Sequence, residues 1–306
     1  MKNILVTGGA GYIGSHLVES LINLKFKITV IDNLMFNQSA NFLRKKNNIN
    51  FIKGDVRDEN LIKEHVNKND IIIPLAGIVG APLSEKMPVE TKQINEDAIK
   101  YLSSICSKNH LIIMPVSNSG YGIGKKDKFC DENSPLNPIS LYGRTKVAAE
   151  KIIMERENSI SFRLATVFGV SKERMRIDLM VNNFTYLAFK NKKFKLYQPN
   201  FRRNFVHISD ISKAFLFSIN NFKKLRNNIF NLGLNNANIT KLELCKKIKS
   251  FLTRFEFEIS NDQEDPDQRD YFVSNEKLKQ FGFEASYGLD DGIKELINYY
   301  TTTDNF

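Results

Sequence analysis

Thr7-Gly8-Gly9-Ala10-Gly11-Tyr12-Ile13-Gly14 is the stretch that decides the fold, because it joins the apolar, strand-like residues 3–7 to a helical pattern. Gly8, Gly11 and Gly14 recur at every third position across this junction. In such a turn, the first glycine permits a tight bend and the second lets backbone approach a pyrophosphate at the helix N-terminus. The third lets helix and strand pack closely. The stretch therefore predicts a dinucleotide site at a strand-to-helix turn.

Short apolar runs alternate with longer amphipathic segments through the first half of the chain. The candidate strands are residues 3–7, 27–31, 49–53, 71–75, 111–116 and 161–164. Strands that alternate with helices predict an α/β fold with a doubly wound parallel sheet, covered on both faces. We expect residues 1–167 to form this dinucleotide-binding domain, with residues 205–232 returning to it. Residues 168–306 would form most of a smaller second domain.

Composition narrows the classes of protein. The chain has 44 Lys and Arg against 34 Asp and Glu, a formal net charge of +10, which suggests a nucleic-acid or other anionic partner. Its three cysteines lie far apart, and no His or Cys spacing is typical of a metal site, so no metal is expected. Without a run of about 18 apolar residues or a secretory signal, we expect a cytoplasmic protein without a membrane span.

Three carboxyl ends of candidate strands carry features typical of NAD binding. Asp32 follows the second strand, where an acidic side chain accepts hydrogen bonds from ribose hydroxyls and repels a 2′-phosphate, so NAD is favoured over NADP. Asp55 follows the third strand, and small residues follow the fourth. We expect the NAD site to comprise Gly8, Gly11, Tyr12, Ile13, Gly14, Asp32, Asn33, Asp55, Val56, Leu75, Ala76, Gly77, Tyr142 and Lys146.

Tyr142 and Lys146 form the candidate catalytic pair. A spacing of four places both on one face of a helix, and an ammonium near a phenol favours the phenolate, so Tyr142 can serve as a general base. Ser117 ends the fifth candidate strand, beside the expected cofactor crevice. Its hydroxyl could hydrogen-bond a substrate oxygen. The three residues predict an acid–base site next to a dinucleotide.

Taken together, these motifs resemble the extended short-chain dehydrogenase/reductases that act on nucleotide sugars. TGGAGYIGS, GDVRD, Ser117, Tyr121-Gly122 and the Tyr142–Lys146 pair follow that family's order, and residues 203–207 resemble its RDFVH-type stretch. The resemblance implies a Rossmann-type fold, a catalytic triad of Ser117, Tyr142 and Lys146, and NAD held by the N-terminal half. It also implies a nucleotide-sugar substrate held by the C-terminal half, and a homodimer.

The resemblance also suggests a subgroup. Dehydratases of the family carry Asp-Glu directly after the Ser or Thr, where this chain has Asn118-Ser119, so 4,6-dehydration is disfavoured. Several other runs look like the GDP-heptose C4 dehydrogenases of capsule-sugar pathways, although UDP-glucose 4-epimerases share most parts. The expected substrate-binding residues are Val79, Gly80, Asn118, Ser119, Arg176, Asn182, Arg203 and Arg269. Spacing alone does not separate Asn182 from Asn183, and Arg176 has a solvated basic surface as its alternative.

The sequence leaves the direction of the reaction open. Oxidation at C4 could end in release of a 4-keto sugar or in return of the hydride, which is 4-epimerisation. A 4-keto-sugar reductase and a 4,6-dehydratase are the enzyme alternatives. A non-catalytic dinucleotide- or RNA-binding protein with a dehydrogenase fold is the alternative from another class. Because Ser117, Tyr142 and Lys146 occur together, we expect an enzyme with no nucleic-acid partner.

Overall fold

A seven-stranded parallel sheet forms the centre of the computed structural model, which describes residues 2–303 except 23, 25, 37–39, 126–127, 192 and 261–268. Its strands run in the order β11-β7-β5-β4-β1-β2-β3. They are β1 (Asn3–Thr7), β2 (Lys27–Asp32), β3 (Ile49–Lys53), β4 (Ile71–Pro74), β5 (Leu111–Ser117), β7 (Ser159–Leu164) and β11 (Asn228–Leu232). The predicted doubly wound parallel sheet is confirmed.

Helices cover both faces of this sheet. The helices are α1 (Tyr12–Ile22) and α9 (Ile208–Asn220) on one face, and α3 (Glu59–Val66), α6 (Ala98–Ile105) and α7 (Leu141–Met154) on the other. Leu17 and Phe215 belong to the core under the first pair, whereas Ile99 and Ile153 belong to the core under the other three. Burial on both faces explains why the strands read as continuous apolar runs.

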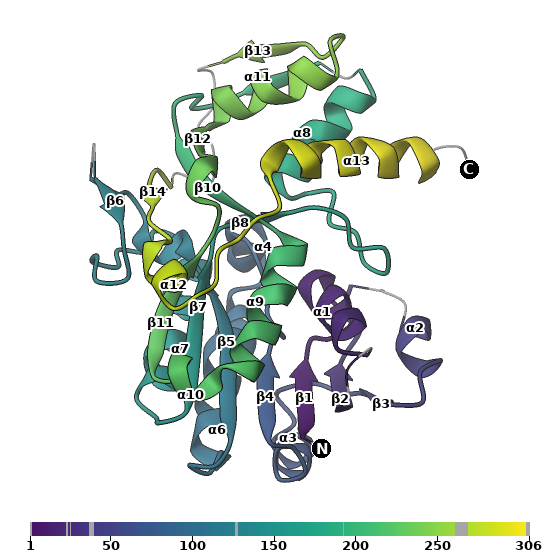
Figure 1. The fold of residues 1–306 in the computed structure, drawn as a ribbon, viewed down its shortest axis with the longest axis vertical. Helices are drawn as coiled ribbons and strands as arrows, with labels where there is room; N and C mark the ends of the chain where they lie inside the picture. Colours follow the sequence, from purple (N-terminus) through teal and green to yellow (C-terminus); the bar gives the residue numbers. More distant parts are fainter. Residues whose placement is uncertain are drawn as a thin grey trace.

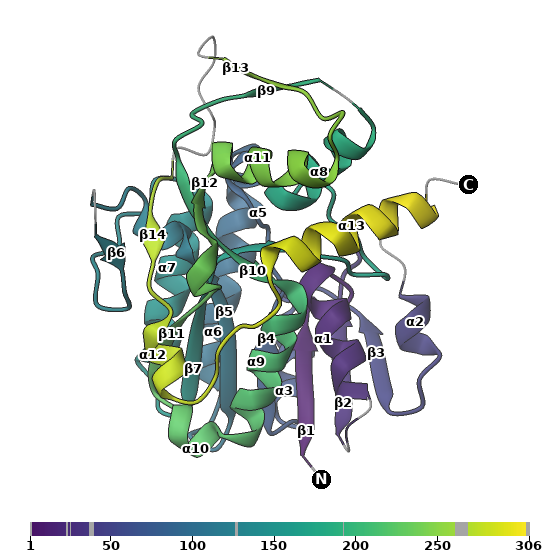
Figure 2. The same cartoon turned by 45° about the horizontal axis from the view of Figure 1, so that its top comes forward.

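A smaller body lies beyond the carboxyl ends of the sheet's strands (Figures 1 and 2). Its elements are α8 (Met180–Phe189), α11 (Lys241–Phe251), α13 (Leu289–Thr303), β8 (Thr166–Phe168), β10 (Arg202–His207), β12 (Asn238–Thr240), β9 (Phe194–Leu196) and β13 (Phe257–Ile259). Phe168, Phe205, Phe255 and Leu296 contribute to its separate core. Strand β10 pairs with β8 and β12 in a three-stranded sheet, while α9 and β11 lie with the large sheet.

One segment of the C-terminal part returns to the chain that follows β5, where it forms a separate two-stranded sheet. Strand β14 (Phe272–Val273) pairs with β6 (Phe129–Cys130), and the Gly124 amide donates to the Asp270 carbonyl at 2.8 Å. The segment 269–274 therefore lies against the chain that follows β5. The short elements elsewhere are α2 (Asn41–Arg44), α4 (Ala81–Lys86), α5 (Pro88–Lys92), a π-helical turn (Gln93–Asp97), 3₁₀ turns (Asn118–Tyr121 and Asn235–Ala237), α10 (Phe222–Leu225) and α12 (Glu276–Gln280).

Among the described residues, no helix combines the length and the apolar composition that crossing a membrane requires. The same residues contain no group of three or more His, Cys, Asp or Glu side chains arranged to hold a metal ion.

Candidate active site

A pocket opens where the strand order of the large sheet reverses, between β1 and β4. In open α/β sheets, ligands bind at this switch point, outside the carboxyl ends of the strands. The residues that line the pocket are Gly8, Gly11, Ile31, Asp32, Asn33, Met35, Phe36, Gly54, Val56, Leu75, Ala76, Gly77, Ile78 and Ile94. The structure thus brings together most residues that the sequence assigned to a dinucleotide site.

The glycine turn leaves no room for a side chain at Gly8 or at Gly14. Gly8 has a φ of +71°, a left-handed conformation that L side chains rarely adopt, and a Cβ there would lie 2.5 Å from the Ala76 amide nitrogen. A Cβ on Gly14 would overlap the Gly8 carbonyl. The close approach of α1 to β1 therefore depends on glycine at both positions. Backbone amides at the start of α1 can face a pyrophosphate.

Two carboxylates lie beside this turn with different surroundings. Asp32 is buried, and its two carboxylate oxygens accept the amides of Ala10 (2.9 Å) and Leu34 (2.8 Å). The Asp55 carboxylate accepts a hydrogen bond from the Arg57 guanidinium at 2.8 Å and one from the Asn33 side-chain carboxamide at 2.9 Å. The hydrogen bond from Arg57 holds the pKa of Asp55 well below its usual range, so the carboxylate stays ionised.

Tyr12 and Ile13 face the protein interior. The Tyr12 hydroxyl donates to the Gly169 carbonyl at 2.7 Å, and burial raises its pKa. Ile13 packs against the core of the large sheet. The side chain of Tyr12 thus ties α1 to the turn that follows β8. Any contact of these two residues with a dinucleotide would come from their backbone at the helix N-terminus.

Helix α7 carries Tyr142 and Lys146 to the crevice. The helix begins after Ser140, whose hydroxyl accepts the Gly143 amide at 3.1 Å. The side chain of Tyr142 is hydrogen-bonded to Ser117, the last residue of β5. A Cβ on Gly77 would lie 3.2 Å from the Lys146 ammonium nitrogen. The three residues of the predicted triad therefore meet next to the floor of the pocket.

The pKa of the Tyr142 phenol is set by groups beyond the one that the sequence predicts. Burial raises the pKa of Tyr142, while the hydrogen bond from Ser117 and the nearby guanidinium groups of Arg269 and Arg176 lower it. The sequence assigned the lowering to Lys146. The Ser117 hydroxyl and two arginines from the C-terminal part thus favour the phenolate, and a contribution from Lys146 stays a prediction.

Lys146 supplies a direct test of whether a dinucleotide fits. The residue is 6% exposed, and burial lowers its pKa from 10.5 to about 8. Within the described part of the chain, its ammonium has no hydrogen-bond or ion-pair partner, although buried cations ordinarily have one. A ribose hydroxyl in the adjoining pocket would satisfy it. The glycine cradle, Asp32 and this buried ammonium all fit NAD.

Asn95 is a structural contributor that the sequence reasoning missed. It is fully buried, and its carboxamide accepts the Ile78 amide at 2.9 Å and donates to the Ile78 carbonyl at 2.8 Å. It stands in the π-helical turn Gln93–Asp97, a distortion that often accompanies functional sites. An uncharged polar residue among the apolar positions of this helical stretch was the available signal. Asn95 fixes the backbone of the pocket floor.

The expected substrate residues divide into two groups. Arg176 and Arg269 are half-buried, and both guanidinium groups are close enough to Tyr142 to lower its pKa. Arg176 also pairs with Asp178 at 2.6 Å. Val79 and Gly80 are half-buried where the chain leaves β4 and enters α4. These four residues have surface near the crevice.

The other four candidates lie inside the protein. Asn182 is fully buried, and its carboxamide contacts the Gly169 amide (3.0 Å) and the Arg176 carbonyl (2.9 Å). Arg203 is 0% exposed and donates to the carbonyls of Arg202 and Arg269. Both side chains are buried and hold neighbouring backbone, and their contact with a substrate stays a prediction.

Asn118 and Ser119 form the 3₁₀ turn directly after Ser117, and each is 1% exposed. Among the described residues, the carboxamide of Asn118 and the hydroxyl of Ser119 have no hydrogen-bond partner. A carboxamide and an aliphatic hydroxyl cannot serve as a proton-donating and proton-accepting pair near neutral pH. This turn therefore holds no carboxyl group for removal of water.

Comparison with known proteins gives the relationship of the chain. Residues 4–233 match the model of the NAD dependent epimerase/dehydratase family. A putative UDP-glucose 4-epimerase of Methanocaldococcus jannaschii is 28% identical, over 97% of both chains. The human dTDP-D-glucose 4,6-dehydratase is 29% identical, over 98% of this chain and 90% of that protein.

Solved structures share the fold. The UDP-glucose 4-epimerase of Thermotoga maritima with UDP-glucose has a TM-score of 0.83 at 24% identity, over 98% of this chain and 99% of that one. The dTDP-glucose 4,6-dehydratase of Bacillus anthracis in complex with NAD has a TM-score of 0.85 at 23% identity, over 100% and 98%. Together with the match over residues 4–233, which is more than half of the chain, these findings show that the chain belongs to the NAD-dependent epimerase/dehydratase family.

Proposed function

We propose that this chain oxidises C4 of a nucleotide-diphosphate sugar, with NAD as its cofactor. The observation that carries the proposal is the meeting of Ser117, Tyr142 and Lys146 beside the pocket at the switch point of the sheet. Relatives that span nearly the whole chain are named as enzymes of UDP-glucose and dTDP-glucose, which supports a substrate of this class. The glycine turn and Asp32 would hold the dinucleotide, and Lys146 its nicotinamide ribose.

Tyr142, Ser117 and two arginines have defined roles in this reaction. Bound NAD supplies the hydride acceptor. Tyr142 removes the proton from the C4 hydroxyl, and Ser117, which is hydrogen-bonded to Tyr142, positions the same oxygen. Arg269 and Arg176 lower the pKa of the phenol and are the candidates for the diphosphate of the substrate, since guanidinium groups bind phosphate oxygens in pairs.

The preferred reaction is a GDP-heptose-like C4 dehydrogenation in the synthesis of bacterial surface polysaccharide, or a 4-epimerisation that uses the same residues. The two differ only in whether the 4-keto sugar leaves or is reduced on its other face. A 4-keto-sugar reductase would run the same step in reverse. Asn118 and Ser119 argue against 4,6-dehydration, because neither provides a carboxyl group after Ser117.

We expect a cytoplasmic homodimer in which the helices over residues 95–108 and 142–157 pair between two copies. The alternative from another class of protein is a non-catalytic role in binding a dinucleotide or RNA. The net charge of +10 is the observation that suggests it. The contact between Ser117 and Tyr142 supports an enzyme over that alternative.

A panel of nucleotide sugars tests the function directly. The purified protein is incubated with NAD and with GDP-, UDP- and dTDP-linked hexoses and heptoses, while absorbance at the NADH band and product identity are followed. A dehydrogenase accumulates NADH and a 4-keto sugar in equal amounts. A 4-epimerase converts the sugar with no net NADH. Absence of any conversion, combined with salt-sensitive binding to RNA, would reverse the ranking of enzyme and binding protein.

A further inference from the structure

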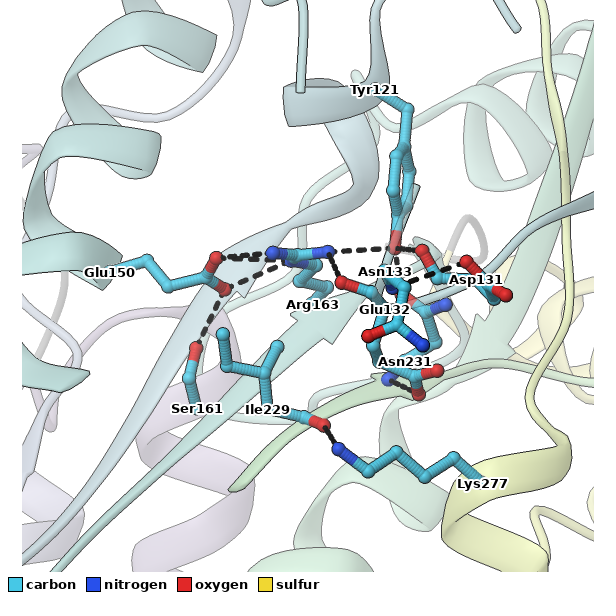
Figure 3. A network of polar contacts seen from close by, with 10 residues as sticks. All are labelled: Tyr121, Asp131, Glu132, Asn133, Glu150, Ser161, Arg163, Ile229, Asn231 and Lys277. Carbon is cyan, nitrogen blue, oxygen red and sulfur yellow. Dashed lines mark hydrogen bonds and ion pairs between the residues drawn. The ribbon is translucent and has the colours of Figure 1, made fainter. Parts of the chain in front are cut away.

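A network of polar contacts centred on Arg163 joins β7 to α7 and to the turn that follows Ser117 (Figure 3). At its centre, Arg163 of β7 donates to Glu150 of α7 at 2.6 Å, and both side chains are 5% exposed. Ser161 donates to the same carboxylate at 2.9 Å. The guanidinium also donates to the Tyr121 hydroxyl at 3.0 Å. One arginine thus joins the catalytic helix to the turn that follows Ser117.

Glu150 stands in line with the proposed catalytic residues. Tyr142, Lys146 and Glu150 are spaced by four along α7, so they share one face of the helix. Ser117, Lys146, Glu150 and Arg163 line one narrow crevice. The ion pair is therefore a buried polar contact that ties this face of α7 to β7, one helical turn beyond Lys146.

The network continues from Tyr121 to the C-terminal segment. The Tyr121 hydroxyl lies 2.7 Å from Asn231 Oδ1, and the Asn231 carboxamide donates to the Ser274 carbonyl at 3.0 Å. Ser274 ends the segment that begins at Arg269, whose guanidinium lowers the pKa of Tyr142. The same chain of contacts thus reaches the segment that carries a proposed substrate residue.

A buried ion pair is weak evidence for stability, because desolvation offsets most of its Coulombic attraction. Its effect on the positions of the partners is larger than its effect on stability. A planar guanidinium that is hydrogen-bonded on two sides fixes where Glu150 and Tyr121 lie. We propose that Glu150, Arg163 and Tyr121 are positioning residues that hold α7, the Ser117 turn and the segment 269–274 in the register that hydride transfer requires. This inference rests on the proposed function.

Two variants interrupt the network with little change in volume or charge. Tyr121→Phe removes the hydroxyl between Arg163 and Asn231, and Arg163→Lys keeps the cation but removes the second arm toward Tyr121. Tyr101→Phe is the matched control, because it removes a phenol that donates to the Glu59 carbonyl at 3.0 Å outside the network. The measurements are kcat and KM for the best substrate of the panel, the melting temperature, and its rise on adding NAD.

We expect each network variant to lower kcat by about 10- to 100-fold, because small misplacements of reacting groups have effects of that size. The KM for NAD and the NAD-induced rise in melting temperature should stay at wild-type values. The double variant should be no more than about 2-fold slower than the slower single variant, since both changes break one link.

Three results would overturn the proposal. The first is a kcat of Tyr121→Phe equal to that of Tyr101→Phe. The second is a double variant in which the two effects multiply, which would mean that the residues act separately. The third is a loss of activity that follows only the loss of folded protein. A wild-type protein that transfers no hydride would overturn the proposed function and this inference with it, so the two failures are distinguishable.

Discussion

The cofactor side and the substrate side of the crevice are built on different principles. On the cofactor side, backbone and glycine form the surface, as at Gly8 and Gly14, and the buried ammonium of Lys146 has no protein partner among the described residues. On the substrate side, charged side chains are already engaged within the chain. Arg176 pairs with Asp178, and Arg203 holds the backbone of Arg269.

This difference predicts how each side responds to its ligand. The cofactor side is preorganised, so NAD binding requires little rearrangement of the protein and the free-energy cost of that rearrangement is small. On the substrate side, a phosphate must compete with an internal carboxylate for Arg176. Changes on the first side should therefore act mainly on NAD affinity, and changes on the second side mainly on the KM of the sugar. A change between the two sides should act mainly on kcat.

Tyr142→Phe lies between the two sides and should have the largest effect. Without the phenolic oxygen there is no base for the C4 hydroxyl, so kcat should fall by about 10³-fold or more. NAD should still bind, since the glycine turn and Asp32 are untouched. Stopped-flow absorbance at the NADH band measures the loss, and calorimetric titration measures NAD affinity. Turnover at the wild-type rate in this variant would show that Tyr142 is not the general base.

Lys146→Met changes the cofactor side and should have the next largest effect. The loss of the ammonium should weaken NAD binding by about 10-fold or more, because a charge-assisted hydrogen bond is lost. Stability should move the opposite way: the apo variant should melt about 5 °C higher at pH 7, since a buried cation without a partner is removed. Calorimetry of both proteins measures the two changes.

The pH dependence of this pair follows from the lowered pKa of Lys146. The folded protein loses the proton near pH 8, whereas the unfolded chain keeps it until about 10.5. Between these values the unfolded state binds more protons, so this residue's contribution to stability rises with pH. The stability difference between variant and wild type should therefore shrink from pH 7 to pH 10. A difference that is constant with pH would contradict the burial of a charged Lys146.

Arg269→Gln changes the substrate side and should have a smaller effect. Removal of one guanidinium should raise the KM of the nucleotide sugar by about 10-fold, the value of one charge-assisted bond to phosphate. The pKa of Tyr142 should rise as well, because Arg269 lowers it, so the acid limb of the kcat profile should move to higher pH. A KM effect on NAD in place of the sugar would erase the distinction between the two sides.

The same contrast explains what the sequence could predict. The strands of the large sheet and the residues of the pocket follow from local rules, since a glycine at every third position and an Asp after the second strand each act through nearby backbone. Ser117, Tyr142 and Lys146 meet because strand ends and helix starts gather at one edge of a parallel sheet. The spacing of residues along the sequence was therefore sufficient to predict which residues lie on the cofactor side of the crevice.

The substrate side depends on packing between segments that are far apart in the sequence. The spacing of residues along the sequence does not predict such contacts. Nothing in the sequence places Arg203 inside the protein or turns its guanidinium to the carbonyl of Arg269, 66 residues away. The burial of Asn182 against Gly169 has the same origin. Asn95 was missed for a related reason: its role depends on a π-helical turn that brings it to Ile78. Residues of this kind are recognised only after the chain is folded.

Asp178→Asn should have the smallest effect, and its sign tests the substrate side most sharply. The carboxylate of Asp178 is 65% exposed and holds Arg176, so its removal should release the guanidinium for phosphate. An exposed ion pair is worth about 0.2–1 kcal/mol, which corresponds to a decrease of about 1.4- to 5-fold in the KM of the sugar. The decrease should become smaller at high salt, because salt screens the competing pair in the wild type. If KM rises instead, Asp178 orients Arg176 toward the substrate, and the substrate side is as preorganised as the cofactor side.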